Sequence, residues 1–536
     1  MSSQKYQEFG LARQSAFGTK ATIPTILLLT DGAGTVEEVQ NAEDEKPYGG
    51  RIFMGASKMP YHTIAKIPQR IYTHNNGLGE HLLGVSNADT KSTPTGGTLA
   101  RRHRFELSTS VIEEYLTIWA KSSQAERSAM DCVLSKLTFN FPKGDAKLVA
   151  EYIGTILAIT STFANTTADY VQPSDSPKKL HSSGIEIFKI GGMTNAVLTR
   201  MINGSLDIDN GIDPESGKFA GSEAVHDIEV GDLAVKASLD FIATTSEVMK
   251  FAWEGGEETP SAVTPSHVSN SFEFIMGIFG KVIGPANSVE ASSAESVAGT
   301  ATMASGGTFI GTEDILYEVE AVQGTPDQYK FRKNGGAWST PADITAGPDA
   351  LDNGVTVTFS STTGALDGDH WHIWALYNHG ERIIEAANAH PANTGVHVVT
   401  TAGTFTGLVD HLYELKISTA AATDKFMWRS REVGGNFSAW SAEVTVTGAA
   451  QDLDHGVTVA FTATTGGVLG DKWSFVAMEA KHGLLFRFPY CILDPAKFGE
   501  NSTRTQVTLP FRVAAPPLQT IGYIDLINEH DTDYDP

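Results

Sequence analysis

One short segment gathers most of the side chains in this chain that could bind a metal ion. The sequence DGDHWH at Asp367–His372 holds two carboxylates and two imidazoles, and both groups are common ligands of divalent ions. A related segment, LGDKWS, recurs later with Lys472 at the position of His370 and Ser474 at that of His372. A metal site common to both segments would need its ligands twice. We therefore interpret these histidines as solvent-facing strand residues and expect no metal site.

Three other groups of residues invite a chemical interpretation. The acidic stretch DIDNGIDPESG at Asp207–Gly217 has its glycine too early for an EF-hand calcium loop, so a hairpin turn is favoured. The basic run ARRHR at Ala100–Arg104 precedes a β segment and indicates a solvated loop or a subunit contact rather than a nucleic-acid reader. The only cysteines, Cys132 and Cys491, lie in apolar stretches typical of buried thiols, not of a disulfide framework or a zinc site.

The sequence lacks the local motifs on which common enzymes depend. It contains no phosphate-cradling glycine motif, no nucleophile elbow, and no His and Glu paired at metal-binding spacing. We therefore expect no catalytic residues, no cofactor-binding residues, no cofactor, and no enzymatic activity.

Length and charge narrow the classes of protein further. A chain of 536 residues suggests three to four domains at about 150 residues each. The formal net charge of −24 argues against nucleic-acid binding through the general surface, which needs clustered cations. No apolar run is long enough to cross a membrane, and the N-terminal sequence lacks the basic and apolar regions of a secretory signal. We expect folding in the cytoplasm and a solvated acidic tail, EHDTDYDP.

A long internal repeat dominates the C-terminal half. LDNGVTVTFSSTTG at Leu351–Gly364 returns as LDHGVTVAFTATTG at Leu453–Gly466, and GTFIG at Gly307–Gly311 returns as GTFTG at Gly403–Gly407. In each copy Val, Val and Phe alternate with Thr or Ala, which is typical of a strand with one buried face. The match predicts two tandem β-sandwich modules that are immunoglobulin-like in broad architecture.

Alternating segments bounded by turn residues continue through the rest of the chain and predict a mainly β fold. Two helices are expected, over Ser110–Ser122 and Ser246–Trp253, while Asp31–Gly97 is taken as a long early loop. The strand-like segments after the repeats resemble neither copy, so the repeats are interpreted as an insertion. The expected domains are 1–170, then 180–290 continued by 481–530, with the repeats at 295–380 and 395–480.

Several segments together resemble the tail tube proteins of long-tailed, siphovirus-type bacteriophages. ARQSAFGTKATIPT at Ala12–Thr25 is similar to the opening of one such family, and Ile202–Ile242 is similar to its strand–loop–strand pattern. The family pattern is matched by Asn210, Gly211, Gly221, Ser222, Asp227, Gly231 and Ser238. The resemblance implies two β-sandwich or barrel units with short flanking helices.

The same resemblance implies a virion function. Subunits would join into rings, and the rings would stack into a hollow tail tube that conducts DNA into the host. Two units in one chain favour a trimer as a pseudo-hexameric ring, with a hexamer as the alternative. The expected partners are further copies of the chain and other tail proteins, namely the tape measure, tail terminator and distal tail proteins. Genome DNA would pass an acidic lumen without specific binding, and assembly would take place in the host cytoplasm.

The repeats would decorate the outside of the tube, where weak contact with host-surface glycans is one role open to them; no membrane contact is expected. Two other functions stay open at this point. A head-decoration or tail-tip protein built from the same modules would remain a monomer or a trimer that never polymerises. A β-modular bacterial surface adhesin is the other alternative, although the missing signal and anchor argue against it.

Overall fold

The structure of the chain is a computed structural model. It describes residues 5–534 apart from 7, 22–23, 25, 29, 32, 40–41, 46–54, 59–61, 74–75, 108–114, 122–125, 161–179, 192, 194–200, 214–230, 244–247, 249–250, 253–270, 284–286, 378–379, 391, 434, 502–503, 515–520 and 532–533.

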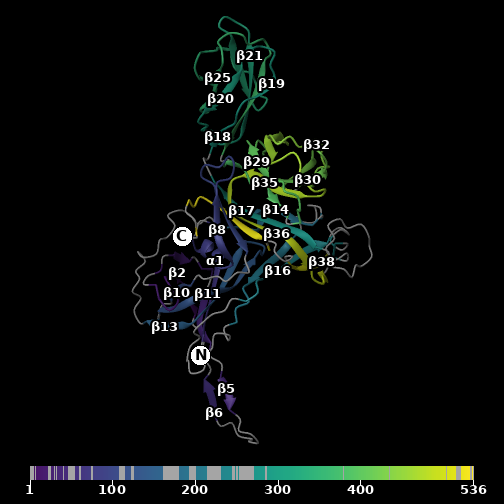
Figure 1. Cartoon of the computed structure of the whole chain (residues 1–536). Coiled ribbons are helices and arrows are strands. Elements are labelled where there is room, and N and C mark those ends of the chain that lie inside the picture. The colour runs from purple at the N-terminus through teal and green to yellow at the C-terminus, as the bar shows by residue number, and fades with distance from the viewer. Residues whose placement is uncertain are drawn as a thin grey trace. The chain divides into compact units, whose positions relative to one another are not determined.

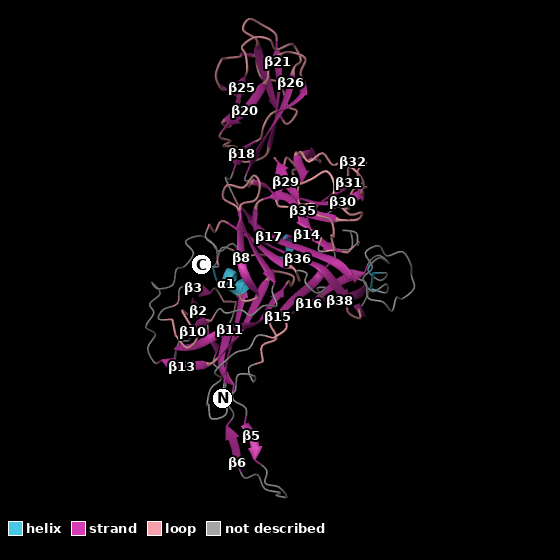
Figure 2. Cartoon of the chain, viewed as in Figure 1, coloured by secondary structure: helices cyan, strands magenta, loops and turns pink. Residues whose placement is uncertain are grey.

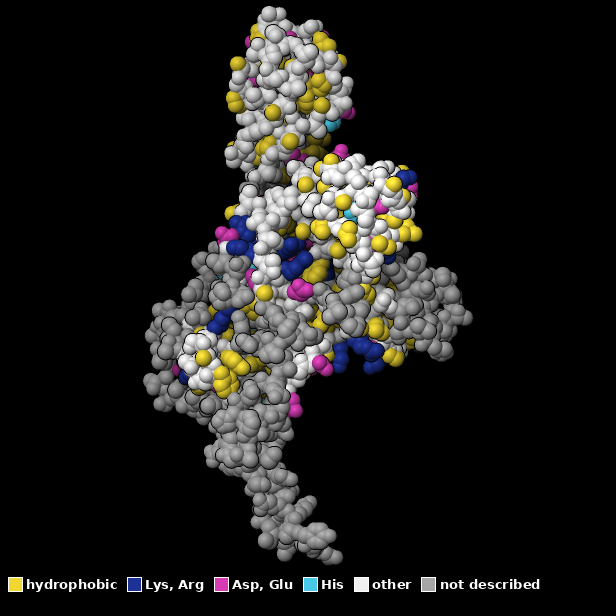
Figure 3. All heavy atoms as spheres, in the orientation of Figure 1, with side chains coloured by type: hydrophobic (Ala, Val, Ile, Leu, Met, Phe, Trp, Pro, Cys, Tyr) yellow, Lys and Arg dark blue, Asp and Glu magenta, His cyan; other side chains and the backbone are white. Residues whose placement is uncertain are grey.

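The chain is mainly β, as its alternating segments predict (Figure 2). It divides into two compact units, one made of Met1–Lys281 with Ile383–Pro536 and the other of Val282–Arg382. The second unit holds the first copy of the sequence repeat and is called the first repeat below. Within the larger unit, residues 383–480 are called the second repeat, and residues 1–281 with 481–536 are called the body. On the face drawn in Figure 3, acidic and basic side chains are interspersed over the described part of the body.

The first half of the body is organised around one long, bent strand, β11. The early part of β11 pairs with β10 and β13, and β10 pairs with β2. From Val133 onward β11 pairs with β12, with a register shift between Leu134 and Lys136 of the kind that bends a strand. Strand β12 pairs with β7, and β7 pairs with β4. The strands of this first set are β2 Glu8–Arg13, β4 Gly34–Val39, β7 His62–Arg70, β10 Leu116–Lys121, β11 Glu126–Asn140, β12 Lys147–Gly154 and β13 Ile156–Thr160.

The second half of the body follows the same order of pairing around β36. The early part of β36 pairs with β39 and the strand also pairs with β17, which pairs with β14. The end of β36 pairs with β38, β38 with β16, and β16 with β15 (Figure 1). The strands of this second set are β14 Ile185–Ile190, β15 Met201–Asp209, β16 Ala234–Ala243, β17 Ser271–Val282, β36 Lys481–Leu493, β38 Arg504–Val513 and β39 Tyr523–Asn528.

The two sets therefore correspond strand for strand in chain order, and they meet at one seam. Strand β11 of the first set pairs with β15 of the second over five residues, from Lys136 opposite Asp209 to Asn140 opposite Ser205. In this correspondence β10 and β11 are joined by the short segment 122–125, whereas their counterparts β17 and β36 are separated by both repeats. The repeats thus occupy the position of a hairpin connection.

A single hydrophobic core serves both sets of strands. Its buried residues extend from Phe9 to Ile278 and from Leu484 to Tyr534. Phe139 of β11 packs edge-to-face on Phe486 of β36 with ring centroids 5.1 Å apart, a favoured geometry for aromatic pairs. Cys132 and Cys491 are both buried free thiols, as expected. The remaining described elements of the body are β1 Lys5–Tyr6, β3 Ile26–Leu28, β5 Ala42–Glu45, β6 Gly55–Lys58, α1 Asn76–Leu83, β8 Ser86–Ser92, β9 Arg101–Leu107, a 3-10 turn at Ser182–Gly184 and β37 Lys497–Asn501.

Each repeat consists of two facing sheets around its own core. In the first repeat one sheet contains β18 Asn287–Val289, β19 Ser293–Ser296, β21 Ile315–Val322, β22 Gln328–Lys333, β23 Ala342–Asp343 and β26 His370–Tyr377, and the other contains β20 Met303–Gly307, β24 Asp349–Ala350 and β25 Val355–Phe359. The second repeat has β27 Arg382–Ile384, β28 Asn388–Ala389, β30 His411–Thr419, β31 Lys425–Glu432, β32 Val444–Thr445 and β35 Lys472–Glu479, facing β29 Val399–Gly403, β33 Gln451–Asp452 and β34 Val457–Phe461.

A close approach of two glycines explains the repeated sequence motifs. Gly307 has φ +91°, and a Cβ there would lie 2.1 Å from the carbonyl oxygen of Gly354. Gly403 has φ +98°, and its Cβ would lie 2.2 Å from the carbonyl oxygen of Gly456. Only glycine fits these positions, because any side chain would meet backbone as well as an unfavourable φ.

Three expectations from the sequence are wrong. The helix expected over Ser110–Ser122 is contradicted at Leu116–Lys121, which form strand β10, while 110–114 and 122 lie outside the described residues. In the other expected helix Val248, Phe251 and Ala252 are helical, and the remaining positions are not described. The stretch Asp31–Gly97 is not a long loop, because it contains β4, β7, α1 and β8. The C-terminal segment is not a solvated tail, because Tyr534 is buried against α1 and the core.

Candidate functional site at the junction of the second repeat and the body

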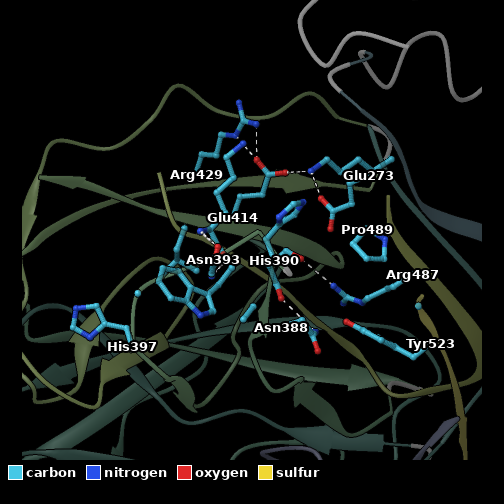
Figure 4. A pocket seen from close by; sticks show the side chains of 18 of the residues that line it. Glu273, Asn388, His390, Asn393, His397, Glu414, Arg429, Arg487, Pro489 and Tyr523 are labelled. Carbon is cyan, nitrogen blue, oxygen red and sulfur yellow. Dashed lines mark hydrogen bonds and ion pairs between the residues drawn. The ribbon is translucent and has the colours of Figure 1, made fainter. Parts of the chain in front are cut away.

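The second repeat is joined to the body by buried charged side chains. The central cation is Lys189 of β14, whose Nζ lies 2.6 Å from Oε2 of Glu273 and 2.5 Å from Oε1 of Glu414. Glu414 belongs to β30 of the second repeat, and its other oxygen accepts a hydrogen bond of 2.7 Å from Nε of Arg429 (Figure 4). The group thus contains two cations and two carboxylates in contact.

The protonation of this group is set by competition between burial and pairing. Burial alone would raise the pKa of Glu414, but Lys189 and Arg429 outweigh it and bring that pKa down to about 2. Burial alone would lower the pKa of Lys189, whereas its two carboxylate partners raise it above its ordinary value. Both groups therefore stay charged at neutral pH, and removal of either would leave an uncompensated buried charge.

A second ion pair lies deeper in the same junction. Nη2 of Arg487 donates to Oε2 of Glu385 at 3.0 Å, and its Nη1 donates to Oγ of Ser474 at 3.1 Å. Beside it, Arg104 holds Asp525 with two hydrogen bonds of 2.8 and 2.9 Å. Each guanidinium group therefore makes two hydrogen bonds, which hold it in one orientation, and one carboxylate balances its charge.

A third contact is built from one cation between two carboxylates. Nζ of Lys481 lies 2.7 Å from Oε2 of Glu186 and 3.1 Å from Oδ2 of Asp410. Burial and then the neighbouring Asp410 raise the pKa of Glu186 to about 7, although Lys481 opposes the change. This carboxyl group therefore changes its charge near neutral pH.

The junction encloses a pocket of about 550 Å³ (Figure 4). Figure 4 shows side chains from the body and from the second repeat converging on it. Its lining includes Arg104, Lys189, Glu273, His390, Glu414, Arg429, Trp440, Lys472, Arg487 and Tyr523. Most of its charged groups neutralise one another, so the arrangement suits a rigid joint between the second repeat and the body.

Four of the residues that match the family pattern can be placed in the structure, and three of these, Asn210, Gly211 and Gly231, lie at one turn of the body. Nδ2 of Asn210 donates to the carbonyl oxygens of Gly84 and Leu134, both at 2.7 Å, and the Asn210 side chain is buried. Gly211 has φ +61°, and a Cβ on Gly231 would lie 2.4 Å from its carbonyl oxygen. Ser238 lies in β16 opposite Ser205. Gly221, Ser222 and Asp227 lie outside the described residues.

The N-terminal segment that carries the other resemblance is anchored to β11. The amide of Gly18 donates to Oδ1 of Asp131 at 2.7 Å, and Thr155 donates to the other oxygen of that carboxylate at 2.5 Å. Asp131 is buried and has φ +52°. The N-terminal segment is therefore held at Gly18 by a buried carboxylate of β11.

The structure separates the residues of the DGDHWH segment. Asp369 is buried and accepts hydrogen bonds from the amides of Ala298, Gly299 and Leu366. Burial would raise its pKa, but these amides lower it. Asp471 is bonded in the same way in the second repeat, which explains the shared Gly-Asp. His370 and His372 are partly exposed on β26, as expected for strand residues facing solvent.

Two further sequence interpretations can be compared with the structure. In the acidic stretch, Asp209 ends β15 and accepts a hydrogen bond from the amide of Gly211, as in a turn, while 214–217 lie outside the described residues. The basic run Ala100–Arg104 is not a solvated loop, because it enters strand β9, where His103 is buried and Arg104 pairs with Asp525.

The junction itself was not foreseen from the sequence. Its partners lie far apart in the chain, 225 positions in the case of Lys189 and Glu414. The available signal was a single lysine in the apolar strand IEIFKI at Ile185–Ile190. A buried lysine requires a charged partner, but its identity could not be read from the pattern.

The body matches a known family of proteins. A family model described as phage tail tube protein matches residues 7–301. The chain belongs to the phage tail tube protein family. It is therefore a structural component of the bacteriophage tail. The match covers the whole first set of strands and β14 to β17 of the second set, while β36, β38 and β39 lie beyond it.

The other comparisons add little. No curated protein matches the chain. Among solved structures, the flagellar hook junction protein FlgK from Burkholderia pseudomallei is similar at 15% identity over 37% of this chain, with a TM-score of 0.13. The match spans 42% of that protein. Within the described part of this tube protein, no helix is long and apolar enough to cross a membrane.

Proposed function

We propose that three copies of this tail tube protein close into a pseudo-hexameric ring and that the rings stack into a hollow tube for DNA. The observation that carries the proposal is the strand-for-strand correspondence of the two sets within the body. Each set would be one tube unit, in line with the sequence division at 1–170 and at 180–290 with 481–530. Six units in a ring then require three chains, and the hexamer of chains is the alternative.

The seam inside the chain offers a template for the contact between chains. Within the body, the late part of β11 lies at the sheet edge of the first set and pairs with β15, which lies at the sheet edge of the second. The counterpart of β15 is β4. Strand β37 pairs with β38 as the late part of β11 pairs with β12, so β37 is the counterpart of that part of β11. We expect β37 of one chain to pair with β4 of the next, so that a single kind of edge contact closes the ring.

The two edges have properties that support this pairing. Among the described residues, β4 pairs with β7 on one side and with only two residues of β1 on the other. Phe498 of β37 is 46% exposed, which is unusual for a large apolar side chain on an edge strand. Lys497 is exposed on β37 and Glu38 is exposed on β4, so the edges can attract each other.

The repeats would decorate the outside of the tube, because a lumen for DNA leaves no room for them. For the second repeat, the buried contacts of Lys189, Arg487 and Lys481 support a fixed attachment to the body. Both repeats would be immunoglobulin-like modules, and contact with host glycans remains one role for them. The lumen would be acidic, in line with the net charge of −24, and would repel the phosphates of the DNA.

Disulfide trapping tests the proposed edge contact. Cysteines would be placed singly along β4 and β37, for example Glu38→Cys with Lys497→Cys, and the protein oxidised. The native cysteines are buried, so they should not form crosslinks between chains. Closed trimers of crosslinked chains are expected for correctly opposed pairs. A control pair of one β4 cysteine with Ser361→Cys in the exposed part of the first repeat should give none. Absence of crosslinks across the whole scan would overturn the β4–β37 contact.

A further inference from the structure

The first repeat brings together three side chains that the sequence keeps apart. His370 and His372 lie two positions apart on β26 and therefore project from the same face of the strand. Glu295 comes from β19, which pairs with β26. The register shifts between Ala294 and Ser296, so Glu295 is the extra residue of a bulge, a feature that redirects a side chain.

The distances among the donor atoms match those of ligands around one ion. Oε2 of Glu295 lies 2.7 Å from Nδ1 of His370 and 3.3 Å from Nε2 of His372. One ligand atom from each of the three residues lies within 4.8 Å of the others. Ligands about 2.0–2.1 Å from a tetrahedral centre stand about 3.3 Å apart, so small adjustments of these side chains would complete three ligand positions.

We propose that Glu295, His370 and His372 form a binding site for a divalent transition-metal ion such as Zn²⁺. Two imidazole nitrogens and one carboxylate oxygen suit zinc, cobalt, nickel or copper rather than calcium or magnesium, which prefer oxygen ligands. Water would complete the coordination. The missing ligands of the second repeat speak against a metal site common to both copies, but not against a site in the first repeat, where Glu295 lies far from the histidines in the chain.

The surroundings of the three ligands favour this assignment. Oε2 of Glu318 lies 3.7 Å from Nε2 of His370, and Glu318 is itself held by Arg332, whose Nε donates to it at 2.9 Å. Nε2 of His370 is buried without a hydrogen-bond partner among the described residues. A modest rotation of that ring would let Glu318 accept from Nε2–H, which would fix the tautomer that leaves Nδ1 free to bind metal.

The second repeat shows why the site would be confined to one copy. There β28 pairs with β35 so that Asn388 stands opposite Ser474, just as Ser293 stands opposite His372. The three ligand positions are consequently occupied by His390, Lys472 and Ser474. A lysine ammonium cannot bind a metal ion, and Ser474 accepts a hydrogen bond from Arg487 of the body.

Metal titration of the full chain tests the proposal. Zinc chloride alone would be titrated calorimetrically at pH 7.5, and cobalt chloride would be used for the visible absorption of the bound ion. We expect one tight equivalent per chain, with affinity reduced about tenfold or more by His372→Ala or by Glu295→Gln.

His390→Ala, at the position in the second repeat that corresponds to Glu295, is the matched control for the other histidines of the chain. It should leave the tight equivalent unchanged. The thermal unfolding temperature of each variant would be measured without metal, and we expect substitutions at these partly exposed positions to leave the fold intact. If the His370→Ala/His372→Ala double variant binds zinc as tightly as the unaltered chain, or if His390→Ala removes the tight equivalent, the assignment is wrong.

Discussion

Lys189 of the body donates to Glu414 of the second repeat across 225 positions of the chain, with Nζ 2.5 Å from Oε1. The first repeat has Glu318 at the equivalent position, paired with Arg332 as Glu414 is paired with Arg429. The same module therefore carries the same Glu–Arg pair twice, and in the second copy this pair also serves as an attachment point to the body.

Loss of the Glu414 charge should loosen the second repeat. Glu414→Gln would leave Lys189 and Arg429 with reduced compensation in a buried place, at a cost of about 3–5 kcal/mol in the free energy of unfolding. Guanidinium denaturation would measure it. The matched control is Glu318→Gln, which should cost about 1 kcal/mol or less because Arg332 is partly exposed. Equal effects of the two substitutions would contradict a special role for the junction.

The junction should also make stability depend on pH through Glu186. Its pKa in the folded chain is about 7 against an ordinary value of 4.5, so the folded state binds this proton more tightly. The stabilisation is complete below about pH 4.5 and disappears as pH rises through about 7. Glu186→Gln, which cannot ionise, should flatten this part of the stability profile. Glu151→Gln, at a surface pair with Lys66, should not; a profile unchanged by Glu186→Gln would count against the assignment.

The glycine contacts in the repeats should be intolerant of any side chain. Gly307→Ala places a methyl group 2.1 Å from the carbonyl oxygen of Gly354 and at φ +91°. The unfavourable φ alone costs about 1–3 kcal/mol, and the overlap adds to it. Gly335→Ala is the control, because φ is +70° there but nothing lies within 4 Å of the added atom. Thermal unfolding should show the larger loss for Gly307→Ala, and equal losses would mean that the overlap is relieved at little cost.

Removal of both repeats should leave the body able to fold. Their position between β17 and β36 corresponds to the short connection 122–125 between β10 and β11, so a short turn can replace residues 283–480. Lys189, Arg487 and Glu186 would then be exposed to water and would be hydrated rather than left unpaired in the interior. We expect smooth tubes in electron micrographs of the shortened protein. Insoluble or unfolded material, with the full chain soluble in parallel, would show that the repeats are required for the fold.

The sequence predicted the β class and the paired modules because those depend on local alternation and on turn glycines such as Gly354 and Gly456. It failed where burial removed the alternation. Leu116–Ala120 are all buried, and a strand buried on both faces cannot be distinguished from a helix by its periodicity. The junction and Glu295 depend on contacts between distant segments, such as that of Lys189 with Glu414, which no local pattern specifies. The strand correspondence in the body was likewise visible only once the pairings were known.

The number of chains in a ring tests the central claim most directly. Electron microscopy of the purified protein at high concentration, with rotational averaging of end views, would count both chains and units. The account predicts hollow tubes of stacked rings, each with six similar inner lobes and threefold symmetry in its outer decoration. Particles that remain monomers or single trimers even with tail extract as a seed would contradict the tube account, and sixfold symmetry of the decoration would contradict the three-chain ring.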